Sequence, residues 1–295
     1  MHAFKTYHPI VNFTYFVFVI GFSCFLMHPV HLLISLFSGF TYSVMLKGKK
    51  QAGRNLISMI SMLLLMGLFN SAFNHEGVTT LAYFPSGNPL TLEAILSGLF
   101  AVTMIVSVIC HFSSYNAVMT SDKFMYLFGK IMPAMSLVIS MTLRFVPRFS
   151  AQLKEVRTAQ KCMGQAIGGR NFFRRIRHGL AVLSIMTTWA LENSIETADS
   201  MKARGYGIPE RTAFSVYKFD RRDKKALICI LFLGMYTLFG AIWGSTYFSF
   251  FPVLRMSAVS PFGISVFAAQ FLLFMCPVII DVWEVRKWKA LSSKI

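Results

Sequence analysis

Six uncharged apolar runs constrain this chain more than any other feature of its sequence. An α-helix rises about 1.5 Å per residue, so about 20 apolar residues cross the hydrocarbon core of a bilayer. Runs close to that length lie at Ile10–Met27, Pro29–Leu46, Leu56–Ala72, Ala94–Cys110, Ala226–Ser245 and Val259–Ile280. We therefore predict an all-α membrane protein with about six transmembrane helices, four before a long polar segment and two after it.

The composition agrees with a polytopic membrane protein and excludes the common soluble classes. Of the 295 residues, 55% are hydrophobic and only 14% are charged. Soluble domains carry roughly a quarter charged residues. The five cysteines lie far apart and have no CxxC or Cys/His pair spacing, so the sequence predicts neither a metal site nor a disulfide framework.

The basic residues segregate between the loops. If the N-terminus is inside, every Lys and Arg except Arg255 lies on the cytoplasmic side, and the outer loop Phe73–Glu93 has no basic residue. Cytoplasmic loops of membrane proteins carry this excess of positive charge. The net charge of +17 therefore reflects topology rather than a nucleic-acid partner, and both termini are predicted to be cytoplasmic.

The spans and the charges divide the chain into three parts. We expect an N-terminal transmembrane bundle of about four spans at 1–112 and a cytoplasmic region with amphipathic helices at 113–225. Two further spans and a basic cytoplasmic tail follow at 226–295. The middle part holds the polar sequence in which a function can be sought.

Two amphipathic helices are predicted in the middle part. The first runs from Arg148 to Gly164 and the second from about Gly179 to Lys202. Both have basic residues in the last turn and a glycine just beyond it, a combination that ends helices. The apolar stretches Ile131–Leu143 and Gly179–Leu191 are too short to span a membrane and are expected to form buried or interfacial helices.

No motif in the sequence carries catalytic chemistry. Nucleotide-binding loops, nucleophile elbows and HExxH sequences are absent. A membrane-embedded enzyme, such as a lipid or isoprenoid transferase, would need an acidic metal-binding cluster, for which the only candidates are Glu192, Glu196 and Asp199. Solvation of a helix surface, or pairing with the basic helix, explains these acids equally well.

A self-sufficient carrier is a third reading of the sequence. Such a carrier normally needs ionisable groups inside the membrane, and only Asp281 approaches the interior of a span. We therefore favour a non-enzymatic subunit that transmits motion supplied by a partner.

The polar region also resembles a known family between Asp122 and Asp223. The resemblance is carried by Asp122-Lys123, Thr142-Leu143-Arg144-Phe145-Val146-Pro147, Glu155-Val156-Arg157-Thr158-Ala159-Gln160-Lys161 and the stretch from Ala198 to Gly207. These sequences are similar to the transmembrane T components of energy-coupling factor (ECF) transporters, the EcfT/CbiQ family.

The resemblance implies an uptake complex for a vitamin or a transition metal in a bacterial or archaeal plasma membrane. It implies two ABC ATPase subunits, which bind the ATP, and a separate substrate-binding integral membrane subunit. The T component itself would have no cofactor and no catalytic residue, and would act as a scaffold and energy-coupling subunit in the lipid bilayer.

The same resemblance implies two ATPase-docking sites, one at the end of each coupling helix. In the family each end carries a short arginine motif, usually Ala-Arg-Gly or Ala-Arg-Ser. The second site is matched by Ala203-Arg204-Gly205. The first reads Lys161-Cys162-Met163-Gly164, with Met163 where the arginine is expected, and we expect an apolar contact of Met163 to replace the charged one.

Overall fold

The computed structural model describes most of the chain. The described residues are 3–48, 53, 57, 59–62, 64–66, 69, 73–74, 76–83, 89–129, 132–164, 172–206, 217–244, 246–250, 253–256 and 260–292. The chain forms two compact units, one made of Met1–Phe124 with Tyr217–Ile295 and the other of Met125–Val216. The division by membrane side at 1–112, 113–225 and 226–295 stays a prediction.

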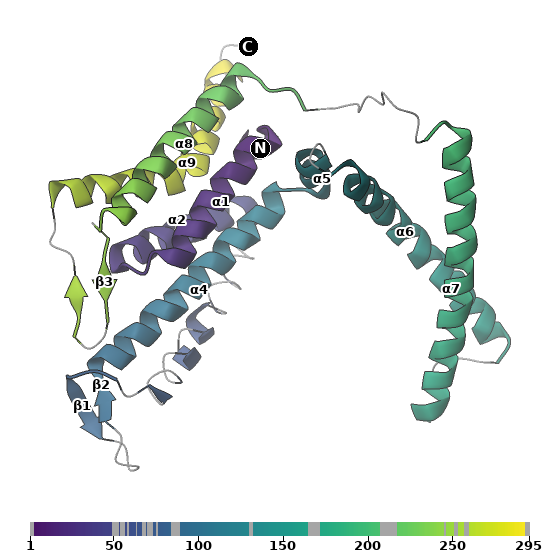
Figure 1. Ribbon diagram of the computed structural model, residues 1–295, viewed down its shortest axis with the longest axis horizontal. Coiled ribbons are helices and arrows are strands. Elements are labelled where there is room, and N and C mark those ends of the chain that lie inside the picture. The colour runs from purple at the N-terminus through teal and green to yellow at the C-terminus, as the bar shows by residue number, and fades with distance from the viewer. Residues whose placement is uncertain are drawn as a thin grey trace. The chain divides into compact units, whose positions relative to one another are not determined.

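The first unit is a helical bundle. Its helices are α1 (Pro9–Phe25), α2 (Pro29–Lys47), α4 (Leu92–Val118), α8 (Arg221–Ile242) and α9 (Pro261–Ser292), preceded by the 3₁₀ turn η1 (Ala3–Thr6). Helix α4 packs against α1 and α2, and α9 packs against α2 and α8 (Figure 1). Two antiparallel pairs of short strands complete the unit: β1 (Thr80–Tyr83) with β2 (Pro89–Thr91), and β3 (Phe248–Ser249) with β4 (Arg255–Met256).

The helices of this unit confirm the predicted fold class. Among the described residues, α2, α4, α8 and α9 are long and apolar enough to cross a membrane, and α1 is a shorter apolar helix. The predicted span Leu56–Ala72 is described only in part, and the residues described there are helical. Helix α4 continues past Cys110 and α9 past Ile280, because the backbone hydrogen bonds of a helix do not end where its apolar run ends.

An aromatic core holds the bundle together. Phe4, Tyr15, Phe16 and Phe274 are almost fully buried in it. The Tyr15 hydroxyl donates a 3.0 Å hydrogen bond to the carbonyl of Phe274, which satisfies the one polar atom that this ring carries into the core. The core thus ties α1 to α9, which lie at opposite ends of the sequence.

Small residues allow the helices to approach closely. A Cβ added at Gly240 of α8 would lie 2.3 Å from a methyl of Val266 in α9. Close packing at glycine is the common way in which helices associate within a bilayer, where no hydrophobic effect drives them together. The contact between α8 and α9 therefore depends on Gly240.

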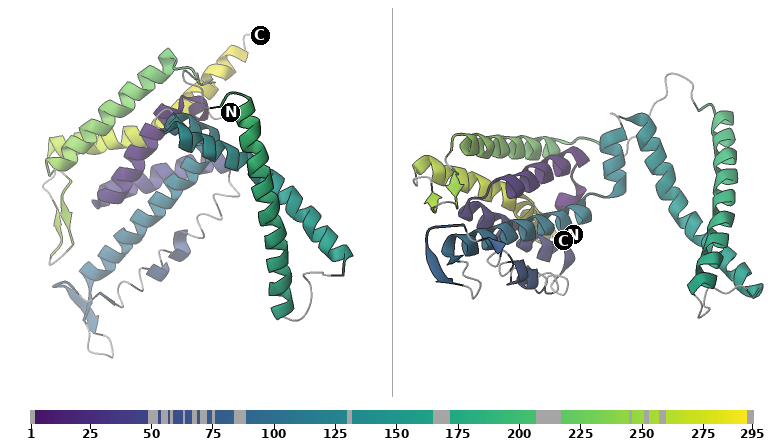
Figure 2. Two further views of the ribbon diagram at one scale, coloured as in Figure 1. Left: turned by 45° about the vertical axis from the view of Figure 1, so that its right-hand side comes forward. Right: turned by 60° about the horizontal axis from the view of Figure 1, so that its bottom comes forward.

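The second unit contains two long helices, α6 (Pro133–Cys162) and α7 (Phe172–Ala203), while the short helix α5 (Ser121–Gly129) crosses the boundary between the units. Helices α6 and α7 cross each other (Figure 2). The rings of Phe149 and Trp189, which lie near the middles of the two helices, are in contact.

The predicted starts of both amphipathic helices were wrong. Helix α6 does not begin at Arg148 but at Pro133, and it takes in most of the stretch Ile131–Leu143, which was predicted to be a separate short helix. It continues through Pro147, a residue that usually ends or kinks a helix. Helix α7 begins at Phe172 rather than at Gly179, which lies inside it.

The predicted ends of both helices are confirmed. Gly164 has a φ of 77° and Gly205 a φ of 79°, so each glycine adopts the left-handed conformation just beyond its helix. A side chain at either position would be strained, which explains why glycine is used there.

Candidate functional site

The contact between α6 and α7 defines the centre of the candidate site. The ring centroids of Phe149 and Trp189 lie 5.3 Å apart with an interplanar angle of 77°, an edge-to-face arrangement. On α7, Met186 and Val182 are buried about one and two turns before Trp189, respectively, so the buried stripe follows helical spacing. The rest of both helices is largely exposed.

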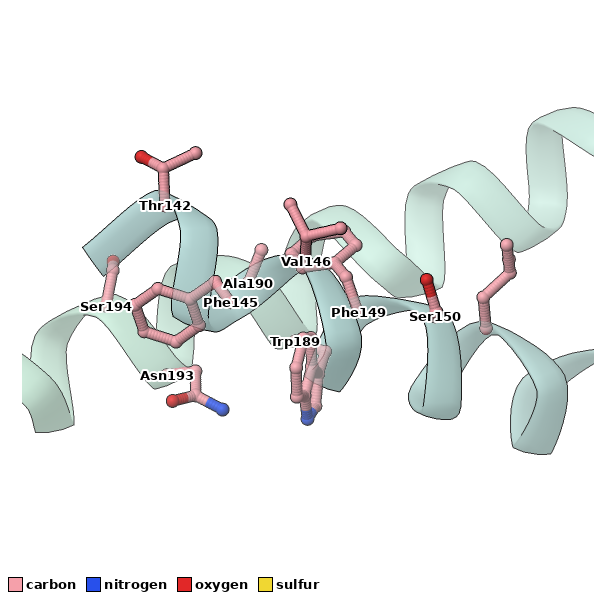
Figure 3. Close-up of a pocket in the computed structure, with 10 residues that line it drawn as sticks. Thr142, Phe145, Val146, Phe149, Ser150, Trp189, Ala190, Asn193 and Ser194 are labelled. Atoms are coloured by element: carbon pink, nitrogen blue, oxygen red, sulfur yellow. The ribbon is translucent and has the colours of Figure 1, made fainter. Parts of the chain in front are cut away.

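A groove of about 460 Å³ lies beside this contact (Figure 3). Phe145, Val146 and Phe149 line it from α6, and Trp189, Ala190 and Asn193 from α7. Apolar clefts with an aromatic wall and a few polar groups are typical binding sites for a partner side chain or a small ligand. The groove was not predicted from the sequence, because it exists only where the two helices cross.

Large apolar side chains are also exposed along both helices. On α6, Val138 and Val146 are exposed, and on α7 Leu183, Leu191 and Ile195 are exposed. Such a set of exposed apolar side chains marks a surface that a partner or lipid covers. The stretch Gly179–Leu191 therefore contributes exposed surface as well as the buried Val182 and Met186, whereas the residues of 131–143 whose burial is described are exposed or half-buried.

The end of α7 has the hydrogen bonds of a Schellman motif. The amide of Gly205 donates to the carbonyl of Lys202 at 2.9 Å, and the amide of Tyr206 donates to that of Met201 at 3.0 Å. This places Arg204 at the C-cap, between the exposed Ala203 and the left-handed Gly205. The Arg204 side chain is exposed and has no ion pair within the described residues.

The end of α6 shares part of this geometry, namely the bond from the glycine amide and the bond from the amide of the cap residue to the carbonyl four residues back, which in α7 runs from the amide of Arg204 to the carbonyl of Ser200 at 3.2 Å. The amide of Gly164 donates to the carbonyl of Lys161 at 3.1 Å, and the amide of Met163 donates to that of Ala159 at 3.1 Å. Met163 is thus the C-cap residue of α6, as Arg204 is of α7, and its side chain is 64% exposed. Lys161 and Cys162 are exposed as well.

The residues of the two helix ends therefore correspond one to one. Lys161 corresponds to Lys202, Cys162 to Ala203, Met163 to Arg204 and Gly164 to Gly205. A helix C-terminus carries exposed carbonyls and the negative end of the helix dipole, which a basic last turn complements. The backbone bonds from the glycine and cap-residue amides match, and the side chains differ at two positions: Cys162 stands where α7 has Ala203, and the thioether of Met163 stands where α7 has the guanidinium of Arg204.

The acidic residues of α7 form no compact cluster. Glu192, Glu196 and Asp199 are exposed, and Asp199 lies 3.9 Å from the ammonium of Lys202. Within the described part of the chain, no group of three or more His, Cys, Asp and Glu residues could hold a metal ion.

A buried polar cluster, which was not predicted from the sequence, lies in the first unit. Lys123 is 5% exposed and its ammonium donates to the carbonyl of Lys5. Burial, and then the charge of Lys5, lowers the pKa of Lys123 to about 8. A carboxylate oxygen of Asp223 accepts a hydrogen bond from the amide of His8 at 3.3 Å. The N-terminal segment thus contacts the residues where the bundle continues into α5 and where α8 begins.

Comparisons with known proteins agree with the resemblance in the sequence. No family model matches the chain. It is 28% identical over 101 residues to the energy-coupling factor transporter transmembrane protein EcfT of Streptococcus equi, a match that covers 34% of this chain and 38% of the relative. For the EcfT protein of Staphylococcus aureus the identity is 31% over 98 residues, covering 33% of this chain and 37% of the relative.

A longer match extends beyond the polar region. The EcfT protein of Streptococcus thermophilus is 27% identical over 187 residues, or 60% of this chain and 70% of the relative. The first two matches span less than two fifths of their relatives' length. The resemblance to the transmembrane components of energy-coupling factor transporters is thereby confirmed.

Proposed function

We propose that this relative of the EcfT proteins is itself the transmembrane component of an energy-coupling factor transporter, and that α6 and α7 are its coupling helices. The observation that carries the proposal is the matched pair of helix ends, which presents Met163 and Arg204 at the same cap position. Two equivalent ends on one chain suit attachment to two equivalent partners.

Each helix end docks on one ABC ATPase subunit. The guanidinium of Arg204 is exposed and unpaired within the described residues, so it is available for a carboxylate of the partner, to which arginine binds in a bidentate manner. Met163 enters the corresponding groove of the other ATPase as an apolar, adaptable side chain. Ala203, Gly205, Cys162 and Gly164 are small enough to let a groove close around each cap residue, and Lys161 borders the first site.

The groove at Phe149 and Trp189 receives the substrate-binding membrane subunit. The groove is apolar, and the exposed side chains of Val146, Leu183 and Leu191 extend the apolar surface around it. Aromatic residues in such pockets dominate the energetics of protein interfaces. The cargo, a vitamin or a transition metal, binds to that subunit and not to this chain.

ATP binds to the partner ATPases, and this chain converts their motion into movement of the substrate-binding subunit. Closure of the ATPase pair changes the distance between the ends of α6 and α7, and the contact between Phe149 and Trp189 carries that change to the groove. The chain performs no chemistry, resides in the bacterial or archaeal plasma membrane and has both termini in the cytoplasm.

Purification from the native membrane tests this function. The tagged full chain should bring down two ABC ATPase subunits and an integral membrane protein that binds a vitamin or a metal. Recovery of a bound lipid or isoprenoid substrate without ATPases would instead favour a membrane-embedded enzyme. Recovery of the chain alone, from membranes that transport the cargo, would favour a self-sufficient carrier.

A further inference from the structure

A second groove, of about 1000 Å³, lies between α8 and α9 in the first unit and plays no part in the proposed coupling. Its two ends differ in chemistry. Leu233, Leu272 and Ile279 line one end, and Arg221, Lys225 and Lys287 line the other. An apolar channel with a cationic mouth matches an amphiphile that carries a negative charge.

The charges at the mouth are only partly neutralised within the protein. Arg222 lies 3.2 Å from the carboxylate of Glu284, and its guanidinium stacks 4.2 Å from the ring of Tyr7. No carboxylate lies within ion-pair distance of Arg221, Lys225 or Lys287 among the residues that the structure describes. All three side chains are exposed and line the groove, and the ammonium of Lys287 also lies 5.4 Å from the centroid of the Trp283 ring. Their positive charge is therefore available to whatever occupies the groove.

The position of the groove along α8 and α9 fits the edge of a bilayer. Trp283 and Trp288 border the basic end and are 63% and 65% exposed, as tryptophans at the membrane interface commonly are. The distance along α8 from Lys225 to Leu233 is about 12 Å at 1.5 Å per residue. One leaflet of hydrocarbon is roughly 15 Å deep, so the apolar part is comparable in length to an acyl chain.

We propose that this groove is a binding site for an anionic phospholipid. The phosphate lies among Arg221, Lys225 and Lys287, with the fork of Arg221 able to bind it through two hydrogen bonds. One acyl chain lies between α8 and α9 against Leu233 and Leu272. The site requires only that the chain is in a membrane, and it is independent of the proposed docking to ATPases.

The four tryptophans of the chain allow a direct test. Trp189 and Trp243 lie outside the groove lining, so a W189F/W243F variant of the full chain reports from Trp283 and Trp288 alone. This variant is placed in phosphatidylcholine vesicles that contain a minority of phosphatidylglycerol, with brominated acyl chains on either lipid. Brominated phosphatidylglycerol should quench the fluorescence more than an equal amount of brominated phosphatidylcholine.

Matched charge variants separate the site from general attraction to the surface. In K225Q/K287Q the preference for phosphatidylglycerol should fall, by roughly fivefold for each basic side chain removed. In K224Q/R286Q, which removes the same charge from exposed neighbours outside the lining, the preference should persist. Two results would overturn the proposal: an equal fall of the phosphatidylglycerol preference in both charge variants, or no such preference before the charges are substituted. Either result would mean that the tryptophans contact only the lipids that surround any membrane protein.

A second pair of variants tests the apolar part. Cys229 is exposed and lines the groove, whereas the adjacent Ile228 is exposed outside it. Cys229→Phe should fill the channel and abolish the preferential quenching, and Ile228→Phe should leave it unchanged.

Discussion

The backbone amide of Phe4 donates a 2.8 Å hydrogen bond to a carboxylate oxygen of Asp281, although 277 residues separate the two in the sequence. Both residues are almost fully buried. The contact fastens the N-terminal turn to α9, and the same segment reaches Lys123 through Lys5 and Asp223 through His8. Residues 3–8 therefore act as a clasp across the bundle.

Removal of the Asp281 carboxylate should destabilise this clasp. Asp281→Ala leaves the buried amide of Phe4 without this acceptor, which costs about 1–3 kcal/mol of unfolding free energy. Thermal unfolding in detergent measures the loss. Glu284→Ala is the control: it breaks only the partly exposed ion pair with Arg222, and such pairs contribute about 0–1 kcal/mol. Equal losses in the two variants would argue against a clasp.

The lowered pKa of Lys123 predicts a particular pH dependence. The folded protein holds this pKa at about 8, against 10.5 for an unperturbed lysine. Between those values the unfolded chain keeps a proton that the folded protein has lost, so stability should rise with pH across this window. The thermal midpoint in detergent should therefore gain more between pH 7 and pH 9 in the unsubstituted protein than in Lys123→Met. The same slope in both proteins would contradict the prediction.

The proposed topology can be tested with single cysteines in an otherwise cysteine-free chain. Native Cys162 is exposed at the end of α6 and should react with an impermeant reagent from the cytoplasmic side alone. Thr80→Cys, on the exposed strand β1, should react from the outer side alone. Labelling of Cys162 in intact cells would contradict the orientation that we infer from the basic residues.

The features that local chemistry determines were predictable from the sequence. Apolar length identified the spans that became α2, α4, α8 and α9, and the glycine stops at Gly164 and Gly205 follow from the strain that other residues suffer at positive φ. The start of α6 was missed because Pro147 reads as a helix end, although the helix continues through it.

Features that depend on the tertiary arrangement could not be predicted. Phe149 and Trp189 each fit an amphipathic pattern, but only the crossing of α6 and α7 brings their rings together and creates the groove. No local signal pairs Asp281 with Phe4. Asp281 stood out in the sequence as an acid near the end of a span, and its partner is a backbone amide that has no signature at all.

Arg204 should be the residue on which assembly with the second ATPase depends most. Removing one member of a buried arginine–carboxylate pair costs about 3–5 kcal/mol. Arg204→Ala and Arg204→Glu should therefore abolish uptake and ATPase co-purification while the protein remains in the membrane. Lys202→Ala removes a charge from the same turn, where the lysine is exposed and paired with Asp199, and should have little effect. Normal uptake by Arg204→Glu would exclude a docking role for this residue.

The contact made by Met163 should respond to salt and to a substituted charge in the opposite way to the contact made by Arg204. Met163 occupies the same cap position as Arg204 but carries a thioether, so its contact with the first ATPase is apolar and should depend little on ionic strength. The Arg204 contact, in contrast, should weaken as salt rises wherever it is partly exposed. Met163→Ala removes part of one apolar side chain, at a cost of at most about 3 kcal/mol, and should weaken the complex without blocking turnover. Met163→Asp places an unpaired charge in the interface and should be far more disruptive.

Co-purification of the ATPases across a salt series measures both effects, with Cys162→Ala as a control at the adjacent exposed position. Assembly of Met163→Asp as complete as that of the unsubstituted protein would place the end of α6 outside the interface, and coupling through two equivalent helix ends would then be wrong for this protein.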